Sequence, residues 1–321
     1  MTRFLLVFLL ALAVGVPELE AQPVSKVARI GVLSPGSPPP LEAIRTGMRE
    51  LGYGEGKNLV FEWRFAEGRN DRLPALAADL VALKPDVLIA INTQAAQAAK
   101  SATADIPIVF VRVSDPRRTG LVASLSKPGA NVTGVSNVAD EIGGKRLETL
   151  KSVLPDLTRI SVLWNAGNPG VALILKDVEQ SSAQLGVQVH NAGVRDASEL
   201  AAALEAIRTS RPGALFVLDD LLLTASREAI LEFAARNRLP VMSLYEEFVR
   251  HGGLISYGPS IEEMYRRATR FVDRILKGAI PGDLPVEQPT QFELVVNLKA
   301  ARELGVEVPA AVLGRADKVL R

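Results

Sequence analysis

Short apolar runs alternate with segments of helical periodicity along most of this 321-residue chain. Apolar runs of about four to eight residues, bounded by polar turns, are typical of buried parallel strands. Between them, apolar residues recur every three or four positions, as on the buried face of a helix. This alternation predicts an α/β fold of parallel sheets with helices on both faces. The predicted strands are 27–33, 59–65, 87–91, 106–113, 159–164, 187–189, 214–218, 239–243 and 252–258.

The strand and helix pattern starts again after Gly134, which predicts two α/β lobes. We assign residues 27–136 and 256–286 to lobe 1, and residues 137–255 and 287–321 to lobe 2. The chain then crosses between the lobes several times, which predicts a hinge that lets two rigid lobes close on a ligand. Two independent domains on a linker are the alternative, but no Ser/Gly-rich linker separates the halves.

Polar residues follow two neighbouring predicted strands of lobe 1, at the sheet edge where open α/β proteins bind ligands. Asn92, Thr93 and Gln94 come before a helix predicted for 95–102, and Ser114 and Asp115 follow the next strand. We expect Thr93 to cap that helix and to leave the following amide N–H groups as an anion site. Thr93 can equally be an N-cap with no ligand.

The balance of charges and the absence of cysteine exclude several functions. There are 37 basic and 36 acidic residues, so no electrostatic footprint for nucleic acid is present. Without cysteine, the chain has no disulfide, no thiolate catalysis and no thiolate metal site. It has two histidines, so a His-rich metal site is not expected. We therefore expect no metal, no other cofactor and no nucleic-acid partner.

The first residues have the pattern of a secretory signal peptide. Arg3 precedes an apolar run over 4–16, and a plausible cleavage site ends at Ala21, although Leu19 is larger than ideal. The run is short for a membrane span, and an uncleaved anchor is the alternative. We expect an exported, periplasmic protein cleaved near Ala21. The signal peptide also stands where a cytoplasmic repressor of this core type would need its helix-turn-helix.

Sequence motifs of enzymes are missing. No G-x-G-x-x-G follows a strand, and there is neither a G-K-[ST] phosphate loop nor a G-x-S-x-G elbow. His190 and His251 have no nucleophile evident in the sequence, so we assign no catalytic residue. A Ser–His–Asp site built from distant residues remains an alternative, because triads are recognised by geometry.

Four long stretches resemble the ABC transporter substrate-binding proteins, some of whose members bind tryptophan or tyrosine. These stretches are 106–116, 119–136, 252–260 and 284–309. The resemblance implies a type I periplasmic binding fold, with two Rossmann-like lobes, parallel sheets and a multi-strand hinge. It also implies a small-molecule ligand in the cleft, a membrane permease and an ATPase as partners, and a monomeric protein.

By analogy with that fold, the ligand site consists of strand-end residues. Asp219 or Asp220 is suited to an ammonium group, because a desolvated cation needs a charged partner. Tyr245 can supply an aromatic wall. Each also has a structural explanation, as a turn residue or as packing between the lobes. The candidate ligand-binding residues are Ser34, Asn92, Thr93, Gln94, Ser114, Asp115, Asn165, Asp219, Asp220 and Tyr245.

The sequence therefore predicts an exported solute-binding component of an ABC importer that captures an aromatic or other hydrophobic amino acid. An aromatic carboxylate or a branched amino acid is the alternative ligand. A periplasmic sensor that presents its closed form to a membrane receptor is the alternative function, and an α/β hydrolase is a further one.

Overall fold

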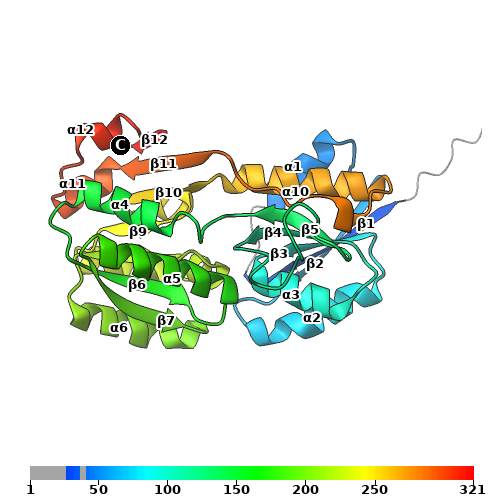
Figure 1. Cartoon of the computed structure of the whole chain (residues 1–321), viewed down its shortest axis with the longest axis horizontal. Coiled ribbons are helices and arrows are strands. Elements are labelled where there is room, and N and C mark those ends of the chain that lie inside the picture. Colours follow the sequence, from blue (N-terminus) through cyan, green and yellow to red (C-terminus); the bar gives the residue numbers. More distant parts are fainter. Residues whose placement is uncertain (1–26, 37–40) are drawn as a thin grey trace, which may run out of the picture.

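Two lobes, each built on one β-sheet, lie side by side in the molecule (Figure 1). The computed structural model describes residues 27–36 and 41–321. The predicted signal peptide, residues 1–21, lies outside the described residues. Within the described ranges, no helix has both the length and the apolar character needed to cross a membrane.

The first lobe contains a parallel sheet of five strands in the order β2-β1-β3-β4-β5. Its helix α10 packs on α1 and on β4 and β5, although α10 comes much later in the chain. The elements of this lobe are β1 (Ala28–Ser34), α1 (Leu41–Glu50), β2 (Leu59–Phe65), η1 (Asn70–Arg72), α2 (Leu73–Ala82), β3 (Val87–Ile91), α3 (Thr93–Ala102), β4 (Ile108–Val113), β5 (Val132–Ser136), α10 (Ile261–Leu276) and η3 (Pro281–Asp283).

The second lobe contains a sheet of seven strands in the order β12-β11-β10-β9-β8-β6-β7, of which β10 and β11 pair antiparallel. Its elements are α4 (Gly143–Val153), β6 (Arg159–Asn165), α5 (Pro169–Gln184), β7 (Gln188–Val194), η2 (Ala197–Glu199), α6 (Leu200–Ser210), β8 (Ala214–Val217), α7 (Leu221–Ala225), α8 (Arg227–Arg236), β9 (Val241–Ser243), α9 (Glu246–Arg250), β10 (Ile255–Pro259), β11 (Phe292–Asn297), α11 (Leu298–Leu304), α12 (Ala310–Leu313) and β12 (Lys318–Leu320). The predicted α/β fold with mostly parallel sheets is confirmed. The predicted lobe boundaries stay a prediction.

The chain passes between the lobes three times in the described residues, before α4, before α10 and before β11 (Figure 1). Two of these crossings are joined by backbone hydrogen bonds. The Glu287 N–H donates to the Gly134 carbonyl at 3.0 Å, and the Ser136 N–H donates to the Glu287 carbonyl at 3.0 Å. Such paired crossings form a narrow hinge, about which two rigid lobes can open and close.

Gly134, in the middle of β5, lets this hinge strand approach β4 closely. Its φ is +152°, and a Cβ at this position would lie 2.0 Å from the Phe110 carbonyl oxygen. Only glycine fits so close to a neighbouring backbone. A glycine also weakens the strand pattern, which explains why the sequence did not predict β5.

One predicted helix has different bounds in the structure, since the helix predicted for 95–102 begins at Thr93. A short helix that the sequence did not predict, α7, precedes α8, and the two meet at Ser226. Helix α7 starts at Leu221 because the Asp220 side chain accepts a hydrogen bond from the Leu222 N–H and caps it. Periodicity alone does not locate such a cap.

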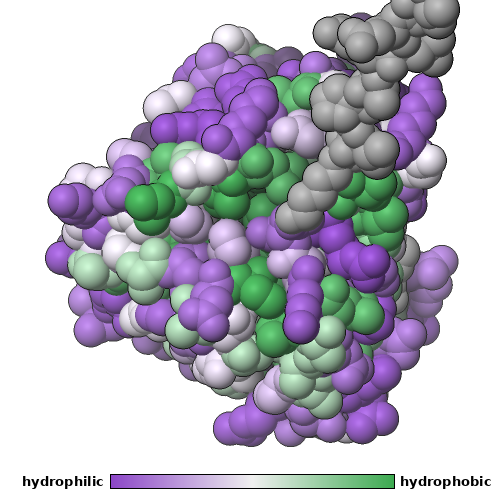
Figure 2. Space-filling model, turned by 90° about the vertical axis from the view of Figure 1, so that its right-hand side faces the viewer, coloured by the Kyte–Doolittle hydropathy of each residue, from purple (hydrophilic) through white to green (hydrophobic). Residues whose placement is uncertain are grey.

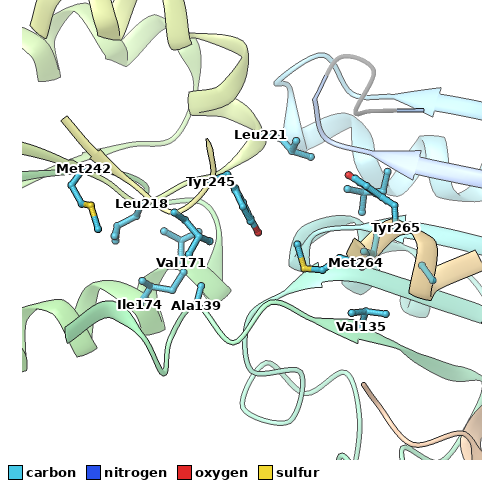
Figure 3. Packing of buried hydrophobic residues seen from close by; sticks show 14 of the residues in the cluster. Val135, Ala139, Val171, Ile174, Leu218, Leu221, Met242, Tyr245, Met264 and Tyr265 are labelled. Carbon is cyan, nitrogen blue, oxygen red and sulfur yellow. The ribbon is translucent and has the colours of Figure 1, made fainter. Parts of the chain in front are cut away.

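Apolar packing is continuous from one lobe to the other. One cluster contains Ile89 and Val111 of the first sheet together with Val162 and Phe216 of the second. Figure 3 shows how it bridges the gap, with the ring of Tyr245 reaching from the second lobe toward α10 of the first. The lobes therefore bury apolar surface against each other, which favours the closed arrangement.

The end of the first lobe is mainly hydrophilic, with apolar side chains across its middle (Figure 2). Among the described residues, the only large apolar side chains classed as exposed are those of Val27 and Ile280, at 47% and 64%. On edge strand β2, Phe61 is buried, whereas Trp63 and Phe65 are half-covered, and the Arg45 guanidinium lies 5.6 Å from the Trp63 ring centre. Scattered exposed apolar residues of this kind are ordinary and indicate no docking site.

Candidate functional site

Strand-end residues of both lobes meet at a small buried space between the sheets. The carboxyl ends of β3 and β4 face it from the first lobe, and those of β8 and β9 from the second. The space is about 10 Å³, which is room for about one water molecule. It is lined by Asn92, Thr93, Arg112, Ser114, Asn137, Asn168, Val171, Asp219, Asp220, Leu221 and Tyr245.

Asn92, and not Thr93, caps helix α3. The Asn92 side-chain oxygen accepts hydrogen bonds from the N–H groups of Gln94, at 2.9 Å, and Ala95, at 3.4 Å. Its φ of 75° and ψ of 173° lie in a region that is essentially restricted to glycine, so the Asn92 backbone is strained. The predicted cap is therefore wrong, and two of the amides expected to bind an anion already have a partner. Thr93 still lines the site and is 1% exposed.

Asp220 accepts hydrogen bonds from four donors within the described residues. Oδ1 accepts from Asn165 Nδ2 at 2.7 Å and from the Leu222 N–H at 2.9 Å. Oδ2 accepts from Asn168 Nδ2 at 2.7 Å and from Asn92 Nδ2 at 3.2 Å. A carboxylate offers about four acceptor positions, so Asp220 is saturated. Since Asn92 belongs to the first lobe, Asp220 also joins the two lobes.

Asp219 is the aspartate with acceptor positions to spare. The structure gives it one hydrogen bond, which the Leu244 N–H donates to Oδ2, and places Arg146 Nη2 3.9 Å from the same oxygen. The Arg146 side chain is fully buried, and its Nε and Nη1 have no hydrogen-bond partner. Arg146 thus supplies a positive charge behind Asp219, on the side away from the cavity wall that Asp219 forms.

The pKa of Asp219 predicts a dependence of stability on pH. Burial raises this pKa to about 6, against the lowering effects of Arg146 and the Leu244 N–H. Between about pH 4 and pH 6, the folded protein keeps a proton that the unfolded chain has released. The free energy of unfolding of the wild type, relative to Asp219→Asn, should therefore fall as the pH rises through this window and level off above it. Urea denaturation of both proteins at several pH values measures this difference, and a difference that rises with pH would contradict it.

Arg112 was missed as a site residue, although it lies in the cavity wall opposite the aspartates. A β-bulge between Val111 and Val113 displaces it from the register of β4, and its φ is 61°. Bulges commonly redirect a side chain next to a functional site. The one signal in the sequence is a single arginine inside the apolar run over 108–113. A buried charge at such a position needs a partner.

The Arg112 guanidinium is held by aromatic side chains. It lies 4.6 Å from the centre of the Tyr245 ring, and Arg112 is 6% exposed. Tyr265 of α10 is also close, but its buried hydroxyl makes no hydrogen bond of good geometry. No carboxylate lies within 4 Å of Arg112 in the part of the chain that the structure describes. Because arginine stays charged even when buried, this cation is available to a ligand anion.

The candidate residues divide into two groups. Asn92, Thr93, Ser114, Asp219, Asp220 and Tyr245 line the cavity, as the list above shows. Ser34, Gln94, Asp115 and Asn165 do not: the Gln94 side chain donates to the Gly167 carbonyl across the cleft at 2.8 Å, and Asp115 accepts from the N–H of Arg118 at 2.9 Å. Asn165 is fully buried and holds Asp220. Ser34 Oγ donates to the Gly36 carbonyl at 3.4 Å, so the four make contacts within loops or to other side chains.

Three further polar contacts complete the wall. Ser114 Oγ donates to Asn137 Oδ1 at 3.0 Å, and Asn137 Nδ2 donates to the Tyr245 hydroxyl at 3.3 Å. Asn168 Nδ2 donates to Asp220, as described above. Asn137 and Asn168, with Val171 and Leu221, were not predicted, because they lie beyond the strand ends in segments where asparagine and proline simply indicate turns.

One serine–histidine pair lies outside the cavity. Ser161 Oγ lies 2.9 Å from His190 Nδ1, but Ser161 is fully buried and also contacts Ser210, and the structure gives His190 no carboxylate partner. Within residues 27–36 and 41–321, no three His, Asp or Glu side chains are grouped so that they could hold a metal ion. The cavity itself has a cation on one side and carboxylates on the other.

Comparison with known proteins identifies similar binding proteins. Residues 29–320 match the family described as ABC transporter substrate binding protein. A tyrosine-binding protein of Clostridioides difficile (strain R20291) is 28% identical over 286 residues, 88% of this chain and 82% of that protein. A crystal structure of an ABC domain in complex with L-Trp, from Streptococcus pneumonia, is 28% identical with a TM-score of 0.84, and the match covers 91% of this chain and 99% of that one.

A third comparison bears on the arrangement of the lobes. The ligand-free, open structure of a substrate binding protein with adhesive properties from Clostridium difficile is also 28% identical, and the match covers 92% of this chain and 99% of that one. Its TM-score is only 0.63. Equal identity with a much lower score indicates that the lobes here are arranged as in the L-Trp complex and not as in the open structure.

Proposed function

The chain belongs to the family of ABC transporter substrate-binding proteins, and on that basis we propose that it captures an aromatic α-amino acid between its lobes. The observation that carries the proposal is the placement of opposite charges on the two lobes. Arg112 of the first lobe faces the cavity, and Asp219 faces the same cavity from the second. An α-amino acid has a carboxylate for the one and an ammonium group for the other.

The overall charge of the site supports a zwitterion. Arg112 and Arg146 carry two positive charges, and Asp219 and Asp220 carry two negative ones once the pH is above the raised pKa of Asp219. A ligand with a net charge would leave one buried charge uncompensated, which is costly in a site of low dielectric. A neutral zwitterion adds one charge of each sign and leaves the balance intact.

The aromatic side chain and the transport role follow from the relatives. One relative is named for binding tyrosine, and another was solved with L-Trp. We therefore propose that this protein is exported, binds its ligand as a monomer, and delivers it to a membrane permease and ATPase. Closure on the ligand is a shift between open and closed forms, because only the closed form contacts the ligand from both lobes.

A thermal-shift screen of residues 22–321 against the natural amino acids tests the function. A ligand that binds only the folded protein raises the free energy of unfolding by about 2.7 kcal/mol at a hundredfold excess over its dissociation constant. We expect the melting temperature to rise with tryptophan, tyrosine or phenylalanine, and to rise little with aspartate or lysine. No rise with any aromatic amino acid would contradict the proposal.

A further inference from the structure

A second and much larger cavity lies next to the closed site. Its volume is about 630 Å³, within the range of cavities that hold small molecules. It extends from the site toward helices α7 and α9 and the start of α10. Three residues line both spaces: Arg112, Leu221 and Tyr245. The inner space of about 10 Å³ has no room for an amino-acid side chain, whereas the outer one has ample room.

The wall between the two cavities consists of side chains that can move. Leu221 of the second lobe lies close to Gly36 of the first lobe. A Cβ added to Gly36 would lie 2.9 Å from the Cβ of Leu221. Tyr245 is held by the ring contact with Arg112 and by the 3.3 Å hydrogen bond from Asn137. Figure 3 shows Tyr245 on the side of the second lobe and Leu221 beside the ribbon of the first lobe, with Met264 and Tyr265 also on the first-lobe side. Leu221, Tyr245 and Arg112, which line both spaces, therefore form the wall between the two cavities.

Most charged side chains that line the outer cavity are paired with a side chain of opposite charge. Its acidic and basic side chains form the ion pairs Arg227–Glu247 at 2.5 Å, Arg250–Glu246 at 2.5 Å, Lys318–Glu246 at 2.7 Å and Lys318–Glu293 at 2.9 Å. Glu262, also in the lining, pairs with Arg266. Of the basic residues in its lining, only Arg112 lacks a carboxylate within 4 Å in the described part of the chain. A large uncharged group therefore fits this cavity better than a second charge does.

We propose that the side chain of the amino acid occupies the outer cavity, and that Leu221 and Tyr245 move aside to admit it while the charged head group stays at Arg112 and Asp219. This inference rests on the proposed function and adds where specificity for a large, uncharged side chain is decided. The cavity selects by size, because a small amino acid leaves it empty.

Substitution with tryptophan at two neighbouring positions tests the inference. Ala225 lines the outer cavity but not the inner space, and it is exposed enough to accept a larger side chain without disturbing the fold. Ala225→Trp fills the cavity. Ala229 is also exposed, lies on the next helix and lines neither cavity, so Ala229→Trp is the matched control. L-Tryptophan and indole, which is its side-chain ring without the charged groups, are titrated calorimetrically into all three proteins.

We expect Ala225→Trp to weaken the binding of both compounds at least tenfold, and Ala229→Trp to leave both within twofold of the wild type. Unchanged binding of L-tryptophan to Ala225→Trp would overturn the inference. A different result would separate the two proposals: the wild type binds indole but not L-tryptophan, and Ala225→Trp does not bind indole. That result would support the outer cavity as a site for the ring, and it would overturn the proposed function.

Discussion

Replacing Arg112 with methionine is expected to weaken the binding of the amino-acid ligand by about a hundredfold. Methionine keeps much of the length and apolar packing of arginine but removes the charge. Removing one partner of a buried, hydrogen-bonded charge pair costs about 2–5 kcal/mol, because the ligand carboxylate is then left buried without a cation. The measurement is a calorimetric titration of the best ligand from the thermal-shift screen into wild type and variant.

Two further variants separate charge from shape at this position. Arg117→Met makes the same change on an exposed arginine five residues away and should leave the affinity within twofold. Arg112→Lys keeps the charge but loses the planar fork of donors, so an intermediate affinity is expected. If Arg112→Met binds the ligand as tightly as the wild type, the carboxylate does not lie at Arg112.

Asp220→Ala is expected to lower the free energy of unfolding by about 3–5 kcal/mol. The substitution removes the acceptor of four hydrogen bonds at once. It leaves the side-chain amides of Asn165 and Asn168 buried without their partner, and helix α7 loses its cap. Chemical denaturation followed by circular dichroism measures the loss.

The control for this prediction is Asp156→Ala, since Asp156 is exposed and takes part in no ion pair among the described residues. It should change the free energy of unfolding by less than about 0.5 kcal/mol. A loss below about 1 kcal/mol in Asp220→Ala would mean that the four hydrogen bonds do not stabilise the folded protein.

Most strands of the first lobe were predictable because each is a local apolar run. The runs over 59–65 and 87–91 are strands with these bounds in the structure. β5, β11 and β12 were not predicted; β5 contains Gly134 and β12 has three residues. Pairing with other strands, which the hydrophobic pattern does not encode, determines such elements.

The location of the site was predictable, but the role of each residue was not. Parallel strands place their carboxyl ends at one edge, so Asn92, Ser114 and Asp219 were expected to lie together. Which of them caps, which supports and which is free depends on distances across the cleft, such as the 3.2 Å between Asn92 Nδ2 and Asp220 Oδ2. Arg112 was missed because the hydrophobic pattern does not encode the bulge that redirects it, and the arginine within the apolar run is the one sign of it.

One measurement tests most directly whether the two lobes together recognise a zwitterion. L-Tryptophan, tryptamine and indole-3-propionate share the indole ring. Tryptamine lacks the carboxylate, and indole-3-propionate lacks the ammonium group. In calorimetric titrations of residues 22–321 we expect L-tryptophan to bind and each analogue to bind at least a hundredfold more weakly, because each leaves Arg112 or Asp219 without its partner. Binding of either analogue as tight as that of L-tryptophan would contradict recognition by opposite charges on the two lobes.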